Sequence, residues 1–379
     1  MEQALTWGLI GGGQGSQIGD AHRFATRLDG LYRFAAGALD IDPERGKAFA
    51  RDLGIAADRA YGSWQEMLER ESARPDPLDL VTVATPNATH FEITRAFLER
   101  GFHVLCEKPL TTTPEEAEAL AALAAERGRI LAVNFGYSGY AMARQARAMV
   151  RAGELGRIRL VVAEFAHGSH GDAADADNPR VRWRYDPKQA GVSSVLADAG
   201  IHALHLASYV TGQSVASVSA DFVSCVAGRE LEDDALLSLR YDGGAVGRLW
   251  ASAVAIGQVH GLNIRVFGET GGLRWHQEAP NQLYWTPLGA PTRILERGAE
   301  GLAPEAARAS RITLGHPEGL VGAFGNLYRD LHDAIRASRR GEASPWLAGL
   351  PLAEAGVETV RVVHAAAESA RNSGRWVEL

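Results

Sequence analysis

The sequence predicts a two-domain α/β protein, and three observations support this class. The chain has 379 residues, well above the mean length of one domain. Its first part alternates short apolar runs with helix-like segments, which is typical of a doubly wound parallel sheet. The remainder reads as strands joined by glycine-rich turns, which indicates a second α/β domain with a large open, mainly antiparallel sheet. We expect the domains to cover residues 1–134 and 135–379.

Five apolar runs are expected to form the strands of the first domain. They span Leu5–Ile10, Tyr32–Leu39, Leu78–Ala84, His103–Cys106 and Ile130–Val133. The intervening segments are rich in Ala, Glu, Leu and Arg, which favour helices. We expect these helices at 43–53, 88–100 and 114–127.

The second domain is expected to contain six strands and three longer helices. The strands span Ile158–Phe165, Val215–Val226, Ala235–Tyr241, Ala245–Val254, Asn263–Phe267 and Gln282–Trp285. The helices are expected at about 198–210, 319–339 and 352–372.

Composition and charge exclude several classes of protein. Apolar residues make up 46% and charged residues 22%, as in an ordinary globular chain. Acidic residues outnumber basic ones 46 to 39, so no overall positive field attracts nucleic acid or an anionic membrane. We therefore expect small-molecule ligands.

Location is predicted from the cysteines and from the apolar runs. Cys106 and Cys225 are too few for a disulfide framework or a cysteine-rich zinc site, which fits a reducing compartment. The N-terminus carries the acidic Glu2 and lacks an export signal, and no apolar run approaches the ~20 residues of a membrane span. We expect a cytoplasmic protein with no membrane partner.

A glycine-rich loop follows the first predicted strand. Residues 8–16 read GLIGGGQGS, which matches G-x-G-x-x-G except that Ser16 stands at the third position. Glycines permit a tight turn and close approach to a pyrophosphate, and the helix that follows offers N–H groups to this anion. The alternative is a flexible turn between strand and helix. Placement after a first strand favours a dinucleotide site formed by Gly11, Gly13, Gln14, Gly15 and Ser16.

Asp40, at the end of the second predicted strand, indicates which dinucleotide is bound. A carboxylate there can accept hydrogen bonds from ribose hydroxyls, whereas a 2′-phosphate would meet like charge. Asp40 could instead form a turn, and Arg45 is near enough in sequence to accept a phosphate. We expect NAD, with NADP less favoured.

Two further motifs follow predicted strands, at the edge where open α/β sheets bind ligands. Thr85-Pro86-Asn87, with His90 beyond it, follows one strand, and Glu107-Lys108-Pro109 follows the next. Lys108 could be an ordinary surface lysine. Pro109 argues against simple exposure, because proline restricts the backbone beside it and can occupy a cis bond.

A third motif places Asp198 four residues before His202. On a helix the two side chains share a face, so the carboxylate can orient the imidazole. A neutral His202 would then accept a hydroxyl proton as hydride leaves the same carbon. Alternatively, Asp198 caps the helix and His202 and His205 are buried, or all three bind a divalent metal. Hydride transfer needs no metal, so with the glycine loop we favour the acid–base pair and expect no metal site.

These four motifs together resemble the Gfo/Idh/MocA oxidoreductases over nearly the whole chain. The resemblance implies a Rossmann domain that binds NAD, catalysis by Lys108, Asp198 and His202, and oxidation of a secondary ring hydroxyl to a ketone. It further implies cofactor contacts by residues of the two strand-end motifs, namely Thr85, Asn87, His90, Glu107 and Lys108. The nearest likeness is to the subgroup of levoglucosan and scyllo-inositol dehydrogenases. The open sheet is expected to join subunits into a homodimer or homotetramer.

Aromatic and polar side chains predict a pocket for a sugar or cyclitol. Tyr137, Arg184 and His316 are the expected substrate contacts besides Lys108, Asp198 and His202. Taken singly, each could equally be a core aromatic or a solvated charge. The stretch from His167 through the acidic run 173–177 departs from the subgroup and stands where a substrate loop is expected. An NAD-dependent glycosidase and a sensor without turnover remain alternative functions.

Overall fold

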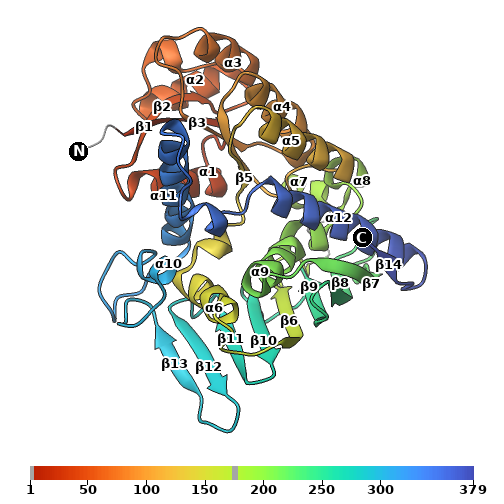
Figure 1. Cartoon of the computed structure of the whole chain (residues 1–379). Coiled ribbons are helices and arrows are strands. Elements are labelled where there is room, and N and C mark those ends of the chain that lie inside the picture. The colour runs from red at the N-terminus through yellow and green to blue at the C-terminus, as the bar shows by residue number, and fades with distance from the viewer. Residues whose placement is uncertain (1–3, 173–177) are drawn as a thin grey trace. The chain divides into compact units, whose positions relative to one another are not determined.

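The computed structural model describes residues 4–172 and 178–379, so Glu2 and the acidic run 173–177 lie outside the described residues. The chain forms two compact units (Figure 1). The first comprises residues 1–111, 115–139 and 320–357, and the second comprises 112–114, 140–319 and 358–379. The predicted division after residue 134 therefore differs from the structure, because the segment 320–357 packs with the first unit.

The first unit contains a five-stranded parallel sheet in the order β2-β1-β3-β4-β5. The order reverses between β1 and β3, which is where doubly wound sheets bind ligands at the carboxyl ends of their strands. All five predicted strands are present, so the predicted parallel sheet is confirmed. Their bounds are β1 (Leu5–Gly11), β2 (Tyr32–Ala38), β3 (Leu80–Ala84), β4 (His103–Cys106) and β5 (Leu131–Val133).

Helices connect these strands, and side chains cap the starts of the first three. Ser16 caps the first helix by accepting a hydrogen bond from the Gly19 N–H, and Asp42 caps the second in the same way. The prediction missed a helix, α3, between the second and third strands. The bounds are α1 (Gln17–Arg27), α2 (Pro43–Asp52), α3 (Trp64–Ser72), α4 (His90–Glu99) and α5 (Pro114–Glu126), with short turns at Ala57–Arg59, Asn87–Thr89, Gly136–Gly139 and Leu347–Gly349.

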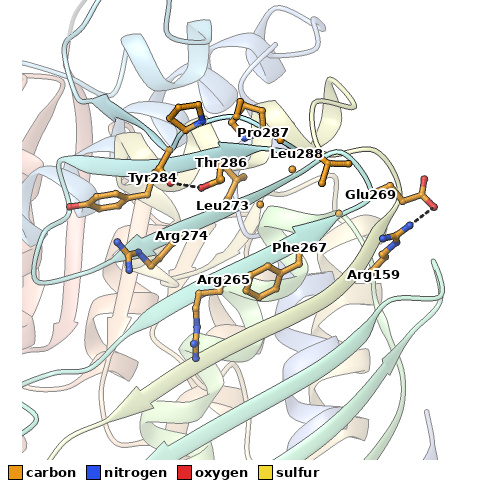
Figure 2. A pocket seen from close by; sticks show the side chains of 17 residues that line it. Arg159, Arg265, Phe267, Glu269, Leu273, Arg274, Tyr284, Thr286, Pro287 and Leu288 are labelled. Atoms are coloured by element: carbon orange, nitrogen blue, oxygen red, sulfur yellow. Dashed lines mark hydrogen bonds and ion pairs between the residues drawn. The ribbon is translucent and has the colours of Figure 1, made fainter.

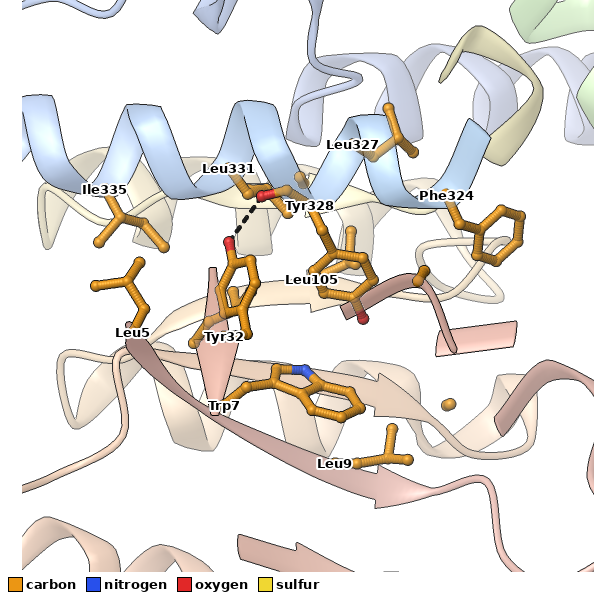
Figure 3. Close-up of a cluster of buried hydrophobic side chains, with 14 of the residues drawn as sticks. Leu5, Trp7, Leu9, Tyr32, Leu105, Phe324, Leu327, Tyr328, Leu331 and Ile335 are labelled. Carbon is orange, nitrogen blue, oxygen red and sulfur yellow. Dashed lines mark hydrogen bonds between the residues drawn. The ribbon is translucent and has the colours of Figure 1, made fainter. Parts of the chain in front are cut away.

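Helix α11 (Leu320–Arg339) packs beside α1 and completes the core of the first unit. Its apolar side chains, among them Leu327, Leu331 and Ile335, lie against residues of β1 such as Trp7 (Figure 3). Gly136 and Gly139 lie so close to α11 that a Cβ atom on either would overlap Phe324 or the Ala323 carbonyl. Burial of these side chains stabilises the unit by roughly 25 cal/mol per Å² of apolar area. A helix from near the C-terminus is thus part of the nucleotide-side core.

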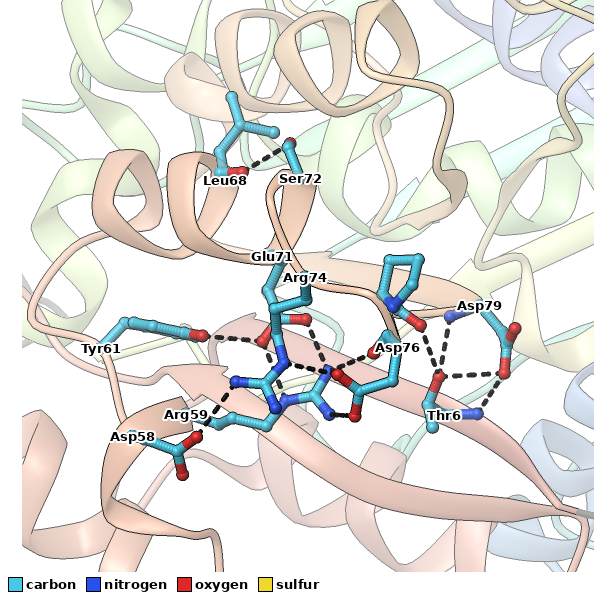
Figure 4. Close-up of polar contacts among 11 residues, drawn as sticks. Thr6, Asp58, Arg59, Tyr61, Leu68, Glu71, Ser72, Arg74, Asp76 and Asp79 are labelled. Atoms are coloured by element: carbon cyan, nitrogen blue, oxygen red, sulfur yellow. Dashed lines mark hydrogen bonds and ion pairs between the residues drawn. The ribbon is translucent and has the colours of Figure 1, made fainter.

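A buried ion pair fastens the segment between α2 and β3. Arg59 donates through Nη2 to Oε2 of Glu71 at 2.5 Å, and the Tyr61 hydroxyl donates to Oε1 at 2.7 Å (Figure 4). Arg59 and Glu71 are both buried, so each charge depends on its partner to offset the loss of hydration. These contacts serve the fold and lie apart from every predicted site residue.

The second unit contains a nine-stranded sheet in the order β13-β12-β11-β10-β6-β9-β8-β7-β14. Only β6 and β9 pair in parallel, which confirms the mainly antiparallel prediction. The prediction missed β11, β13 and β14. The bounds are β6 (Ile158–Ala166), β7 (Val215–Val223), β8 (Asp234–Tyr241), β9 (Val246–Ser252), β10 (Asn263–Gly268), β11 (Gly271–His276), β12 (Gln282–Pro287), β13 (Arg293–Glu296) and β14 (Val377–Glu378).

Two helices pack together against this sheet. They are α6 (Ala141–Arg151), which the prediction missed, and α9 (Ile201–Thr211), which follows a π-helical turn at Leu196–Gly200. The other helical segments are α7 (Pro179–Arg182), a 3₁₀ turn at Trp183–Tyr185, α8 (Pro187–Ala190), α10 (Pro304–Ala307) and α12 (Ala353–Arg371). Over the residues that the structure describes, no helix is both long and apolar enough to cross a membrane.

Candidate active site

The glycine loop lies at the point where the strand order of the first sheet reverses. Gly11 pairs with Ala84 at the carboxyl ends of β1 and β3, and its backbone has a φ of +76°. A Cβ atom there would lie 2.3 Å from the Ala84 carbonyl oxygen, so only glycine fits. Gly13 is equally restricted, because a Cβ would lie 2.6 Å from the Leu39 carbonyl oxygen. At Gly15 a Cβ would meet nothing within 4 Å.

Ser16, at the third glycine position of the motif, has a structural role that the sequence did not predict. Ser16 accepts a hydrogen bond from the Gly19 N–H at 3.1 Å, so it serves as the cap of α1. Gly19 takes the role of the close-packing glycine, because a Cβ there would lie 2.2 Å from the carbonyl oxygen of Gly12. The sequence contained this signal as a glycine four residues beyond Gly15, outside the usual spacing.

Asp40 lies two residues beyond the end of β2 and beside the glycine loop, where Gly13 approaches it closely. Arg45 holds it with two hydrogen bonds, from Nε at 2.7 Å and from Nη2 at 2.6 Å. These bonds lower the pKa of Asp40, so the carboxylate is ionised at neutral pH. Arg45 is thus oriented by Asp40.

His90 joins the two strand-end motifs of the first unit. Its Nδ1 lies 2.7 Å from the Pro109 carbonyl oxygen and its Nε2 lies 2.9 Å from the Thr85 carbonyl oxygen. Two carbonyl oxygens can both accept only when the ring is doubly protonated. Burial lowers the pKa of His90, but the neighbouring Cys106 sulfur and the two carbonyls raise it to about 9.

The predicted cofactor contact by His90 is therefore corrected. The residue is fully buried, and both of its ring nitrogens already face protein carbonyls. Its position instead fixes the motif that contains Thr85 against the motif that contains Lys108. Thr85 and Asn87 are partly exposed and remain available at this edge.

Glu107 is buried beside Lys108 and is surrounded by donors. Its Oε1 accepts hydrogen bonds from His22 Nε2 at 2.9 Å and from Asn134 Nδ2 at 2.5 Å. Its Oε2 accepts a hydrogen bond from the Lys108 backbone N–H at 3.1 Å. Burial alone would raise the pKa of Glu107, but His22, Asn134 and the Lys108 charge lower it below its ordinary value. Lys108 itself is half-buried, and its peptide bond to Pro109 is cis, as the sequence suggested.

The residues at this edge fit a dinucleotide. Asn134, at the end of β5, keeps its Oδ1 buried without a hydrogen-bond partner among the described residues. The loop at Gly15 leaves open space above the first turn of α1, where backbone N–H groups and the helix dipole favour an anion. Asn134 is a candidate cofactor contact that the sequence prediction missed, because no motif marks it.

In the second unit, Asp198 and His202 span the junction between the π-helical turn and α9. The π turn adds a residue to the helical ladder, so the Ile201 N–H contacts the Leu196 carbonyl five residues back. Such turns often occur at functional sites. Asp198 Oδ2 accepts a hydrogen bond from Arg184 Nε at 3.0 Å. The structure therefore brings together Asp198 and Arg184, two of the predicted substrate contacts.

A buried carboxylate anchors the start of this helix. Glu232 Oε1 accepts hydrogen bonds from the Ser193 hydroxyl at 2.6 Å and from the N–H groups of Ser194 at 2.9 Å and Leu196 at 3.2 Å. Burial raises the pKa of Glu232 despite these bonds. The contact positions the segment that leads to Asp198.

Histidines that the prediction did not assign lie near this pair. The rings of Phe165 and His202 lie 5.9 Å apart, and those of Phe165 and His167 lie 6.0 Å apart. Burial lowers the pKa of His167 to about 4, with a small opposing effect of Asp198, so its ring is neutral at pH 7. His205 is buried in the helix and has a pKa of about 3 for the same reason, which agrees with its exclusion from the proposed pair.

Tyr137 and His316 occupy different surroundings. Tyr137 is buried in the turn that contacts α11 in the first unit. His316 is exposed in a loop of the second unit that Arg297 holds through the Glu318 carboxylate at 2.9 Å. A substrate contact by either residue stays a prediction. Within the described ranges, no three His, Cys, Asp or Glu side chains are grouped so as to hold a metal.

A large open groove lies elsewhere on the second unit. It has a volume of about 1110 Å³ and is lined by residues of β10, β11 and β12 (Figure 2). Arg265 and Phe267 contribute to it and alternate along β10 with the buried Ile264 and Val266, so they occupy the opposite face of the sheet. None of the predicted site residues lines this groove.

Comparison with known families covers both units. Residues 5–135 match a family described as the oxidoreductase family with an NAD-binding Rossmann fold, and residues 143–274 match the GFO/IDH/MocA C-terminal domain. These matches confirm the resemblance that the motifs indicated. The first unit is accordingly an NAD-binding Rossmann domain.

Individual relatives agree with this match. The uncharacterized oxidoreductase YfiI of Bacillus subtilis is 37% identical, over 100% of this chain and 98% of its own. The levoglucosan dehydrogenase of Pseudarthrobacter phenanthrenivorans is 28% identical over 74% of this chain and 76% of its own. A crystal structure of an inositol dehydrogenase homolog from Azotobacter vinelandii, complexed with NADH and myo-inositol, is 44% identical with a TM-score of 0.92, covering 100% of this chain and 98% of that one.

Proposed function

Because the chain belongs to the Gfo/Idh/MocA oxidoreductase family, we propose that it oxidises a secondary ring hydroxyl of a sugar, anhydrosugar or cyclitol to a ketone. NAD, when bound, supplies the acceptor for the hydride. The observation that carries the proposal is the placement of Lys108 at the sheet edge that also contains the glycine loop. The similarity to a levoglucosan dehydrogenase and to an inositol dehydrogenase homolog supports the substrate class.

We assign the proton transfer to residues of both units. His202 takes the proton of the substrate hydroxyl as the C–H bond donates its electron pair as hydride. Asp198 orients the imidazole of His202. It also accepts a hydrogen bond from Arg184, whose guanidinium can donate to neighbouring substrate hydroxyls. The Lys108 ammonium donates a hydrogen bond to the reacting oxygen and stabilises the negative charge that develops there.

The ionised Asp40 supports NAD as the preferred cofactor. Its carboxylate can accept hydrogen bonds from the adenosine ribose hydroxyls, while a 2′-phosphate would be repelled. Arg45 reduces that repulsion, so NADP is the weaker second cofactor.

The test is a screen for NADH production with inositols, aldoses, levoglucosan and simple glucosides, run with NAD and with NADP. Replacing Lys108 with Ala is expected to lower kcat by ~10²–10⁴, the usual contribution of positioned acid–base and electrostatic groups. The matched control is Lys47→Ala, which removes a lysine of α2 instead.

Three outcomes of this screen would contradict the proposal. An unchanged kcat in Lys108→Ala removes the catalytic assignment. Release of an aglycone from a glucoside without net NADH indicates the NAD-dependent glycosidase. Tight NADH binding without turnover of any substrate indicates a sensor.

We also propose that the groove on the second unit pairs with a second copy of the chain in a homodimer or homotetramer. Its face exposes the apolar side chains Phe267 and Leu288, which are 41% and 78% accessible. Flanking ion pairs such as Arg265–Glu164 offer both signs of charge to an identical surface. Light scattering that gives a monomer of 40.6 kDa at all concentrations would contradict this assembly.

The cysteine usage supports a cytoplasmic location.

A further inference from the structure

A continuous chain of buried hydrogen bonds crosses the first unit and ends at Lys108. Trp7 Nε1 donates to the Thr82 hydroxyl at 2.9 Å, and this hydroxyl lies 2.9 Å from the Tyr328 hydroxyl. The Tyr328 hydroxyl lies 2.8 Å from Nδ1 of His22, whose Nε2 contacts Glu107. Figure 3 shows the ring of Tyr328 of α11 over the indole of Trp7 of β1.

One arrangement of the hydrogens satisfies every group along this chain. The Thr82 hydroxyl accepts from Trp7, so its own hydrogen is available to the Tyr328 oxygen. The Tyr328 hydroxyl then donates to Nδ1 of His22, and the hydrogen on Nε2 is directed at the Glu107 carboxylate. Every hydroxyl donates once and accepts once. The hydroxyl of Tyr328 therefore selects the Nε2–H tautomer of His22.

The far end of the chain is the backbone of the proposed catalytic lysine. Glu107 presents Oε1 to His22 and Asn134 and presents Oε2 to the Lys108 N–H. The carboxylate is fixed only while donors face both oxygens, because an unpaired buried charge is strongly unfavourable. His22 is 0% exposed and Tyr328 is 2% exposed, and the ring nitrogens of His22 and the hydroxyl of Tyr328 already have partners inside the unit, so both residues act through these partners.

We propose that Tyr328 and His22 are positioning residues for Lys108, acting through the buried carboxylate of Glu107. This inference rests on the proposed catalytic role of Lys108. It assigns to the C-terminal helix α11 a function besides packing, since its Tyr328 hydroxyl sets the tautomer of a histidine in α1. A loss of this hydroxyl should displace the lysine without weakening the glycine loop.

The first experiment needs no substrate. Nitrogen-15 NMR of the histidine side chains of the protein should show one ring as the Nε2–H tautomer, assigned to His22 by its disappearance in His22→Gln. Tyr328→Phe should shift the Nδ1 resonance of that ring. A ring protonated on Nδ1 alone, or no shift in Tyr328→Phe, would overturn the proposal.

The second experiment separates positioning from packing by a matched pair of variants. Tyr328→Phe removes the hydroxyl that contacts His22 and Thr82. Tyr32→Phe removes another buried hydroxyl, which donates to the Tyr328 backbone carbonyl at 2.8 Å and has no place in the chain. Tyr328→Phe should lose more thermal stability than Tyr32→Phe, because it removes two buried hydrogen bonds and Tyr32→Phe removes one.

Kinetics of these variants use NAD and the best substrate of the screen. Tyr328→Phe should lower kcat by about tenfold with the KM for NAD unchanged, because displacement of a reacting group is costly even over short distances. Tyr32→Phe should leave kcat near that of the native protein. His22→Gln, which retains an N–H toward Glu107, should be more active than His22→Leu. Equal kcat values for Tyr328→Phe and Tyr32→Phe would overturn the proposal.

Lys108→Ala distinguishes the two levels of inference. If Lys108→Ala retains full kcat, the proposed function itself fails. If it abolishes activity while Tyr328→Phe behaves like Tyr32→Phe, only the positioning role fails. If the catalytic role of Lys108 and the positioning role of Tyr328 are both correct, Tyr328→Phe should cause no further loss of kcat in a Lys108→Ala background. The effects of residues that act as a unit are not additive.

Discussion

Each unit contains a buried glutamate that holds a segment of the proposed site, but the two are held by different partners. Glu107 faces the imidazole of His22, the amide of Asn134 and the charge of Lys108. Glu232 faces a serine hydroxyl and two backbone N–H groups. Burial raises the pKa of both carboxyls, yet the net direction is downward at Glu107 and upward at Glu232. Burial acts in the same direction on both carboxyls, so the different partners account for the opposite net directions of their pKa shifts.

This comparison teaches that the buried glutamate of the first unit is held partly by charged neighbours, whereas the buried glutamate of the second unit is held by neutral dipoles. His90, which bridges the Thr85 and Pro109 carbonyls, is a second buried charge at the nucleotide side. The first unit should accordingly be the more sensitive to loss of a charge and to pH.

The largest effect is expected for the exchange of Glu107 for glutamine. Glutamine at position 107 has one acceptor oxygen for donors that face both oxygens of the carboxylate, so one donor must face the new NH₂ group. We expect Glu107→Gln to lower kcat by ~10², the typical cost of a misplaced catalytic group. Steady-state kinetics with the best substrate of the screen would measure this.

Glu232→Gln is the matched control for that exchange. All three donors face Oε1 of Glu232, and the amide oxygen of glutamine can accept them in the same way. Its kcat should stay within about twofold of the native value, because no donor loses its acceptor. Similar losses in the two variants would break the distinction between charged and neutral anchoring.

An intermediate effect is expected for the unfolding free energy, which should depend on pH through the protonation of His90. Its folded pKa of about 9 lies above the ordinary value of 6.5, so its contribution to stability is complete below pH 6.5. That contribution is lost as pH rises through 9, and it amounts to about 3 kcal/mol. Denaturant unfolding of the native protein and of His90→Gln between pH 6 and 10 would measure it.

The sign of this change is the informative part. The native protein should lose more unfolding free energy than His90→Gln over that range. A parallel NMR titration of His90 in the native protein covers the case in which the variant fails to fold. A ring that titrates near pH 6.5 would show that no buried charge joins the two motifs.

The smallest effect is expected at Asp40, where the charge is held at a partly exposed position. Asp40→Ala removes the acceptor of the ribose hydroxyls and frees Arg45 toward a 2′-phosphate. We expect the preference for NAD over NADP, measured as the ratio of kcat/KM values, to fall about tenfold. An unchanged ratio would show that the cofactor preference is set elsewhere.

Local patterns predicted most of the fold. Apolar runs located all five strands of the Rossmann domain, and the six strands predicted for the second unit are present. The misses have physical reasons. β11 begins with Gly271 and Gly272, which read as a turn, and β14 has two residues, too few for any periodic signal. Helix α6 was missed because it is almost entirely buried and begins directly after a glycine-containing turn.

The residues of the candidate site divide in the same way, into those that a local sequence pattern marks and those that no local pattern marks. The glycine loop, Asp40, Lys108, Asp198 and His202 could be proposed from the sequence because each motif places its chemistry within a few consecutive residues. Gly19, Asn134 and Glu232 were missed because their roles depend on contacts across the fold. His90 was found but assigned to the cofactor, since its two carbonyl partners cannot be read from its neighbours in sequence.

The sequence by itself determined the fold class, the family and the motifs at the ends of the strands, because periodicity and short spacings are local properties of a chain. Only the tertiary structure decided that α11 belongs to the nucleotide side and that Tyr328 contacts His22, 306 residues away. A hydrogen bond depends on distance in space and on the absence of competing water. For residues so far apart, both conditions are created by packing of the core and leave no local pattern.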